Sequence, residues 1–150
     1  MSNITTVHNT IISTLATLFP NKTVIPNAYD LEQNPSPLLR DGYGLKIGSS
    51  TKEDGEFCDY LYTQEYIVVL TKEILRTDED DTQINVNGLA ILEDVHTIRK
   101  DFYNVDQVGA EANIRMVELG STTDLNFNPR DGFNFASMEA SFLFTIEETL

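Results

Sequence analysis

The chain holds few side chains of the kinds that act as nucleophiles, bases or soft metal ligands. It has two histidines, His8 and His96, and one cysteine, Cys58. A catalytic centre needs a nucleophile, a base and a group that orients them, and a zinc site needs Cys or His ligands at short spacings. Neither pattern occurs, so the histidines are interpreted as surface or core-edge residues and Cys58 as a small apolar filler. We therefore predict no catalytic residue, no metal site and no cofactor.

The acidic run Asp78–Asp81 is the strongest candidate for binding a cation. An EF-hand loop that began at Asp78 would need glycine at its sixth position and glutamate at its twelfth. The chain has Gln83 and Leu89 at these two positions. A solvated loop is therefore the favoured interpretation, and a loose surface calcium site stays open as an alternative.

A short glycine-rich segment, Gly42-Tyr43-Gly44, is the only hint of a phosphate-binding loop. Such a loop needs a Lys-Ser or Lys-Thr pair at the start of a helix, and neither follows here. The segment instead predicts a turn that leads into a strand.

Length and charge narrow the class of protein. The 150 residues fit a single domain, residues 1–150, with a substantial core. The formal net charge is −14, from 24 acidic and 10 basic residues. Tight binding to nucleic acid needs a basic surface, and anionic membranes also attract basic segments, so neither partner is expected. The start of the chain lacks the pattern of a signal peptide, and we expect synthesis in the cytoplasm.

Two segments have the apolar spacing of amphipathic helices. Residues 3–19 form the first, with Ile12 and Phe19 widening its apolar stripe. Residues 86–104 form the second. The apolar stripes expected to be buried are Ile4, Val7, Ile11, Leu15 and Leu18 in the first helix, and Leu92, Val95, Ile98 and Phe102 in the second.

The remaining apolar segments alternate as strands do. The last strand is the most regular, because apolar residues occupy every second position from Ala136 to Ile146. Phe133 and Phe135 fall on the opposite parity, which predicts a bulge or bend. The strands are expected at residues 23–26, 43–47, 57–72, 112–119 and 136–146. The fold class is therefore α+β, a mainly antiparallel (mixed) β-sheet of about four to five strands with two α-helices packed on one face.

Three polar connections are candidates for contacts between subunits or with neighbouring proteins. They are Ser49–Glu56, Arg76–Thr82 and Asn126–Gly132, and each is more polar than a core requires. The candidate interface residues are Lys52, Glu53, Asp54, Asp78, Glu79, Asp80, Asp81, Asn128, Arg130 and Asp131.

The order of these features resembles a known family. A short helix ends at Leu18-Phe19-Pro20, and the segment Arg40–Gly48 follows a polar connection that contains prolines. A long strand, Tyr60–Thr71, precedes the second helix, and the strand Ala140–Ile146 closes the chain. Over nearly its full length the chain is similar to the tail terminator (tail-completion) proteins of long-tailed bacteriophages.

This resemblance implies an α+β subunit of a ring, expected to be a hexamer. The ring would cap the tail tube protein, dock to the head-completion or connector protein, and let DNA pass through its lumen. The protein would be made in the host cytoplasm and remain in the tail or neck of the virion. The alternatives are another neck protein, a small acidic protein-interaction module that binds one basic partner, and an enzyme.

Overall fold

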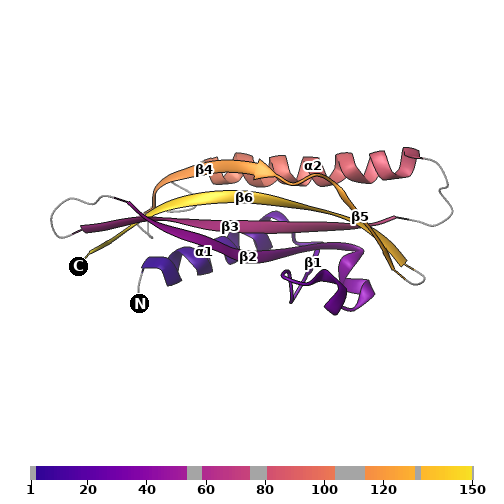
Figure 1. The fold of residues 1–150 in the computed structure, drawn as a ribbon, viewed down its shortest axis with the longest axis horizontal. Coiled ribbons are helices and arrows are strands. Elements are labelled where there is room, and N and C mark those ends of the chain that lie inside the picture. The colour runs from indigo at the N-terminus through magenta and orange to yellow at the C-terminus, as the bar shows by residue number, and fades with distance from the viewer. Residues whose placement is uncertain (1–2, 54–58, 75–80, 104–113, 131–132, 150) are drawn as a thin grey trace.

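The computed structural model describes residues 3–53, 59–74, 81–103, 114–130 and 133–149 (Figure 1). The elements follow in the order α1 (Asn3–Leu18), β1 (Thr23–Val24), the 3-10 helices η1 (Leu31–Gln33) and η2 (Ser36–Leu39), β2 (Asp41–Glu53), β3 (Asp59–Ile74), α2 (Asp81–Tyr103), β4 (Ile114–Thr122), β5 (Asn126–Arg130) and β6 (Phe133–Thr149). The strands form one sheet in the order β1-β2-β3-β6-β4, and β5 pairs with β6.

The centre of the sheet is the pair of long strands β3 and β6. Every residue of β3 pairs with β6, from Asp59 opposite Thr149 to Ile74 opposite Asn134, without a register shift. On its other side, β6 pairs first with β5 and then with β4. Among the described strands, only the short contact between β1 and β2 is parallel. The mainly antiparallel, mixed sheet is confirmed, with six strands in the described residues rather than four to five.

Both helices cover the same face of the sheet. The alternation in β6 places Phe142 and Phe144 on this face, where both are fully buried. The ring of Phe102 in α2 lies 4.9 Å from that of Phe142 and 5.6 Å from that of Phe144. The helical residues buried in this core are Val7, Ile11, Leu15, Ile91, Val95, Ile98 and Phe102. The predicted α+β architecture with two helices on one face is confirmed.

The predicted burial of two helical residues is wrong. Leu92 is 38% exposed, whereas Ile91 is fully buried. Ile91, Val95, Ile98 and Phe102 recur at spacings of four, three and four, which keeps them on one side of a helix with 3.6 residues per turn. In α1, Ile12 is 48% exposed and does not widen the buried stripe.

A second, smaller core lies on the opposite face of the sheet. Phe135 points to this face and is buried against Ile25 and Leu39 from the segment that contains the two 3-10 helices. The expected bulge near Phe133 and Phe135 is wrong, because both residues are paired without a register shift; a bend at this place stays a prediction. The odd parity of Phe135 reflects burial on the second face.

The glycines of β2 make room for this covering segment. A Cβ atom at Gly44 would lie 2.8 Å from the Cβ of Ala28, and one at Gly42 would meet the carbonyl oxygen of Leu38 and the side chain of Ile25. Both glycines lie within β2, not in a turn before it. Their role is the close approach of two backbones.

Two polar connections contain more strand than the sequence predicts. β2 continues to Glu53, past a register shift between Ile47 and Ser50, so the start of the expected loop Ser49–Glu56 is extended strand. The expected turn Asn126–Gly132 begins with β5, which pairs with the first residues of β6. Cross-strand hydrogen bonds in each case override a polar composition.

The end of β6 caps the start of α1. The first amide groups of a helix have no partner within the helix. The carboxylate of Glu148 accepts hydrogen bonds from the backbone N–H of Asn3 at 2.7 Å and of Ile4 at 3.3 Å. The side-chain amide of Asn3 donates to the carbonyl oxygen of Glu147 at 2.6 Å. The two ends of the described chain are thereby joined.

We predict that Glu148→Ala lowers the free energy of unfolding by about 1 kcal/mol, because two amide groups and the positive end of the helix dipole lose their carboxylate. Urea denaturation monitored by circular dichroism measures the change. Glu118→Ala is the matched control, since Glu118 is an exposed acid on β4. Equal stability of the two variants would contradict the capping role.

Candidate functional site

The predicted contact residues that the structure describes lie at two ends of the sheet. Lys52 is exposed near the end of β2 and aligns through Tyr62 with Ile146 of β6. Asn128 lies in β5 opposite Phe135 of β6, and its amide donates to the hydroxyl of Ser137 at 2.9 Å. Eleven residues of an extended strand separate these two levels, or about 36 Å. The structure does not bring Lys52 and Asn128 together.

For the other predicted contact residues, the structure describes either the backbone alone or nothing. Glu53 ends β2, Asp81 begins α2 and Arg130 ends β5, and only the backbone of these three residues is described. Asp54, Asp78, Glu79, Asp80 and Asp131 lie outside the described residues, as does Cys58. The possible calcium loop therefore stays a prediction.

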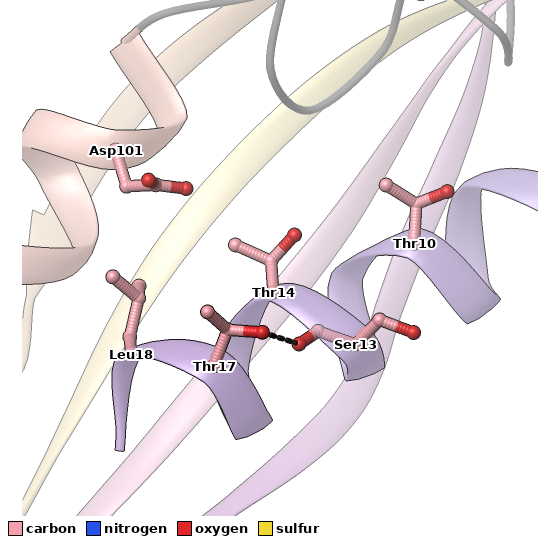
Figure 2. A pocket seen from close by; sticks show the side chains of 6 residues that line it. All are labelled: Thr10, Ser13, Thr14, Thr17, Leu18 and Asp101. Atoms are coloured by element: carbon pink, nitrogen blue, oxygen red, sulfur yellow. Dashed lines mark hydrogen bonds between the residues drawn. The ribbon is translucent and has the colours of Figure 1, made fainter. Parts of the chain in front are cut away.

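A groove of about 340 Å³ separates the two helices (Figure 2). Four hydroxyl side chains from α1 line it, and Asp101 of α2 points toward it from the other side. Burial raises the pKa of the Asp101 carboxyl. The lining residues are Thr10, Ser13, Thr14, Thr17, Leu18 and Asp101.

The groove does not assemble the parts of a hydrolytic centre. The hydroxyls of Thr10 and Thr17 donate to the carbonyl oxygens of Thr6 and Ser13, one turn earlier in α1. His8 lies 3.2 Å from the hydroxyl of Tyr66 in β3 and does not line the groove. Within the described part of the chain, no three His, Cys, Asp or Glu residues are grouped as metal ligands. The groove is a mainly polar surface lined by hydroxyl groups and one carboxyl group.

A cluster of ion pairs ties the end of α1 to the sheet and to α2. The side chain of Lys22 is only 8% exposed, and its ammonium group contacts Asp41 of β2 and, at 2.9 Å, Asp94 of α2. Lys72 of β3 also reaches Asp41, at 3.2 Å. Burial alone would raise the pKa of Asp41, but the two lysines outweigh it and hold this pKa below its ordinary value of 3.8. The cluster is well suited to fixing the helix layer on the sheet.

Apart from Tyr103 at the end of α2, the exposed large apolar side chains of the described residues belong to elements at the two long edges of the sheet. One group, here called the β2-edge set, comes from α1, β1, β2 and the segment between β1 and η1. The other, the β4-edge set, comes from α2, β4 and β5 on the opposite side (Figure 1). The β2-edge set is Ile12, Val24, Tyr29 and Ile47, and the β4-edge set is Val86, Leu89, Leu92, Leu119 and Phe127.

Most of these side chains lie in stretches of sequence without charge. Residues 2–21 and 23–29 contain no Asp, Glu, Lys or Arg, and neither do residues 82–92, 119–123 and 125–129. The whole chain nevertheless has a formal net charge of −14. These exposed apolar side chains therefore lie mainly in neutral stretches, although charged residues such as Glu118 on β4 flank them.

Sequence reasoning missed both edge sets, because it searched the polar connections for contact surfaces. A usable signal was present in the charge-free stretches. Ile12 and Leu92 each add an apolar residue beside a complete buried stripe, which is a second signal. Helical spacing instead predicts that Leu92 is buried and that Ile12 widens the buried stripe of the first helix.

The sequence was compared with protein families and with curated proteins. No protein-family model matches the chain, and no curated protein is similar to it in sequence. No helix in the described residues combines the length and apolar character that crossing a bilayer requires.

We predict that Lys22→Met lowers the free energy of unfolding at pH 6 by about 2 kcal/mol, since two carboxylates lose a largely buried charged partner. It should also flatten the dependence of stability on pH. A carboxyl whose pKa is lowered by folding stabilises the protein above its unfolded pKa, and this contribution disappears as the pH falls through the folded pKa. Without Lys22, the pKa of Asp41 rises toward its ordinary value.

Urea denaturation at pH 6 and pH 3 tests this prediction. The loss of stability between the two values should be smaller for Lys22→Met than for the wild type. Lys52→Met removes an exposed lysine and serves as the control. An unchanged difference between the two pH values in Lys22→Met would show that the cluster does not set the pKa of Asp41.

Proposed function

We propose that this protein is a structural subunit of a phage virion, a tail terminator that assembles into a ring at the head-proximal end of the tail tube. In this role the ring ends growth of the tube and presents a surface to the head-completion or connector protein. The subunit is made in the host cytoplasm and is retained in the tail or neck.

The observation that carries the proposal is the position of the exposed apolar side chains. Most of them belong to elements at two opposite edges of one sheet and lie in stretches of sequence without charged residues. Apolar surface that stays exposed on a folded subunit commonly marks a site of protein association. Two different surfaces on opposite sides of a subunit are what a head-to-tail contact requires, and repeating such a contact gives a ring when the rotation closes.

The order and type of the elements also support the proposal. The chain has the short first helix, the long central strands, the second helix and the closing strand on which the resemblance to tail terminators rests. The length of β3 and β6, at 16 and 17 residues, well exceeds the usual length of a strand. These two strands form the centre of the sheet, with β2 along one side and β4 and β5 along the other.

The charge of the chain is compatible with a ring through which DNA passes. A formal net charge of −14 repels phosphate groups, so DNA in the lumen is not held tightly. This argument concerns the subunit as a whole and assigns no residue to the lumen.

We predict that the purified protein forms closed rings on isolated tail tubes. Negative-stain electron microscopy of tubes mixed with the protein should show a cap on one end only, because the two ends of a tube differ. Tubes that keep polymerising in the absence of the protein should stop growing when it is added. An unrelated acidic protein of similar size serves as the control.

Two outcomes would contradict the tail terminator proposal. If an antibody against the protein labelled intact particles in the neck but away from the end of the tail tube, the protein would be another neck component. A strictly monomeric protein that binds one basic cellular protein and ignores tail tubes would instead indicate an acidic interaction module.

A further inference from the structure

We propose that neighbouring copies of this protein meet head to tail, the β2 edge of one copy against the β4 edge of the next, at a common level along the strands. The inference rests on the proposed function, since it names the surface by which the ring subunits bind one another. The occupant of each edge is therefore a second copy of this chain.

The directions of the strands allow this contact. Each step from β2 to β3, from β3 to β6 and from β6 to β4 is antiparallel. β2 and β4 therefore run in opposite directions. If a second copy extends the sheet with its helices on the same side, its β2 meets β4 of the first copy in the antiparallel arrangement, the more stable one per residue.

The apolar side chains at the two edges lie at matching levels. Ile47 of β2 aligns with Tyr66 of β3, then with Phe142 of β6, and finally with Leu119 of β4. Residues directly opposite each other point to the same face of a sheet, so this row lies under the helices. Its inner members, Tyr66 and Phe142, are buried, whereas Ile47 is 54% exposed and Leu119 is 39% exposed. The row is thus an apolar layer whose two end residues, Ile47 and Leu119, are exposed to solvent.

A second pair of exposed residues follows the same arrangement. Val24 of β1 aligns through Tyr43 and Leu70 with Met138 of β6. Phe127 of β5 aligns with Ala136, two residues from Met138 along β6. The offset is about 7 Å, which an aromatic side chain spans. Contact between Leu119 and Ile47 of the next copy would therefore bring Phe127 near Val24.

The strand edges beyond these residues also match. Ser50 and Val117 both align with Phe144 of β6, and Lys52 and Ile114 both align with Ile146. The sheet order leaves β4 at one edge, and β1 covers β2 only at Gly42 and Tyr43. At this end the two edges can pair through backbone hydrogen bonds.

At each edge, a side chain of the same molecule forms a hydrogen bond with one backbone group. The hydroxyl of Tyr29 accepts a hydrogen bond from the N–H of Ile47 at 2.9 Å. Arg99 donates to the carbonyl oxygen of Gly120 at 3.1 Å. Near the apolar row, the contact is therefore made by side chains, with the exposed ring of Tyr29 beside Ile47.

Charge explains why a second copy fits these edges. Two molecules of net charge −14 repel each other across most of their surfaces. The segments that carry Val24 and Tyr29, and those that carry Leu89, Leu119 and Phe127, are without charge. Around Leu119 and Ile47, an identical copy can therefore approach through mainly uncharged side chains.

The matching levels also favour a closed assembly. A head-to-tail contact with a shift along the strands gives a helical filament, whereas a contact by rotation alone closes into a ring. Because Ile47 and Leu119 lie at one level, no shift is needed to bring them together. The inferred geometry is that of a ring whose axis runs along the strands, within the tilt that sheet twist imposes.

Cross-linking with a short bis-maleimide tests the contact. In a Cys58→Ser background, Ile47→Cys and Leu119→Cys are prepared as separate chains, one of them with a size tag. The mixture should give a cross-linked heterodimer, while neither variant alone should give a dimer. The double variant Ile47→Cys/Leu119→Cys should give a ladder of oligomers. In the control mixture, Ser13→Cys, which is exposed on α1, replaces Ile47→Cys. It should not cross-link to Leu119→Cys.

Two results would overturn the proposal. Homodimers from either single variant alone would show that like edges meet across a two-fold axis. No cross-link between Ile47→Cys and Leu119→Cys, at concentrations where the wild type is oligomeric or on capped tubes, would show that the edges do not meet.

Charged variants provide a second measurement. Leu119→Asp or Ile47→Asp should weaken self-association by roughly tenfold or more, because each places a carboxylate in an apolar contact. Both side chains are partly exposed, so circular dichroism should remain that of the wild type. Thr17→Asp adds the same charge to an exposed site in α1 and should leave association unchanged. Equal effects of Thr17→Asp and Leu119→Asp would overturn the proposal.

The two proposals can fail separately. Cross-linking between the two edges without capping of tail tubes would leave the contact in place and refute the tail terminator function. Capping of tubes by the Leu119→Asp variant with the affinity of the wild type would retain the function and refute this contact.

Discussion

The unbroken antiparallel pairing of β3 with β6 determines the rest of the structure. Because side chains alternate between the faces of a strand, a shift of one residue would exchange the two faces. All residues of β3 are paired with β6 in one register, so a single alignment fixes which side chains meet the helices. The same alignment fixes the levels at which β2 and β4 present their side chains. The main core and the two edges are therefore consequences of one register.

The two faces of this central pair are covered in different ways. On one face, Phe142 and Phe144 pack against Phe102 of α2, and the helix layer is tied down by Lys22 and Glu148. On the other, Phe135 lies under a segment without long helices. Since both layers cover the middle of the sheet, apolar side chains remain exposed mainly along its edges. The arrangement of the layers thus determines where another molecule can bind.

Alternation and helical spacing predict much of this fold, because both patterns follow directly from backbone geometry. The regular alternation of β6 correctly predicts the face that Phe142 and Phe144 occupy. The spacing in α2 cannot by itself separate Ile91 from Leu92, since adjacent apolar residues differ only in which side of the helix the sheet covers. The burial of Phe135 likewise depends on a segment about a hundred residues earlier in the chain, which a local pattern does not contain.

The apolar edges, on which the proposed contact rests, are less predictable from the sequence for a physical reason. Polar connections were favoured as contact surfaces because binding residues often lie on loops, yet Lys52 and Asn128 lie at opposite ends of the sheet. The edge sets combine α1, β1 and β2 on one side, and α2, β4 and β5 on the other. Their members come together only after the sheet order is known. Local sequence therefore contains the neutral stretches, while the tertiary structure determines that they line two opposite edges.

The coexistence of a large net charge and neutral edges has a consequence for assembly. Repulsion between free acidic subunits acts over about 8 Å at physiological ionic strength, so it opposes association before apolar side chains make contact. A neighbouring structure that holds several subunits at once raises their effective concentration and offsets this repulsion. In the proposed ring, apolar edges such as Ile47 and Leu119 supply short-range attraction, and the tail tube supplies the template. Under this proposal, free subunits repel one another and associate where the tube ends.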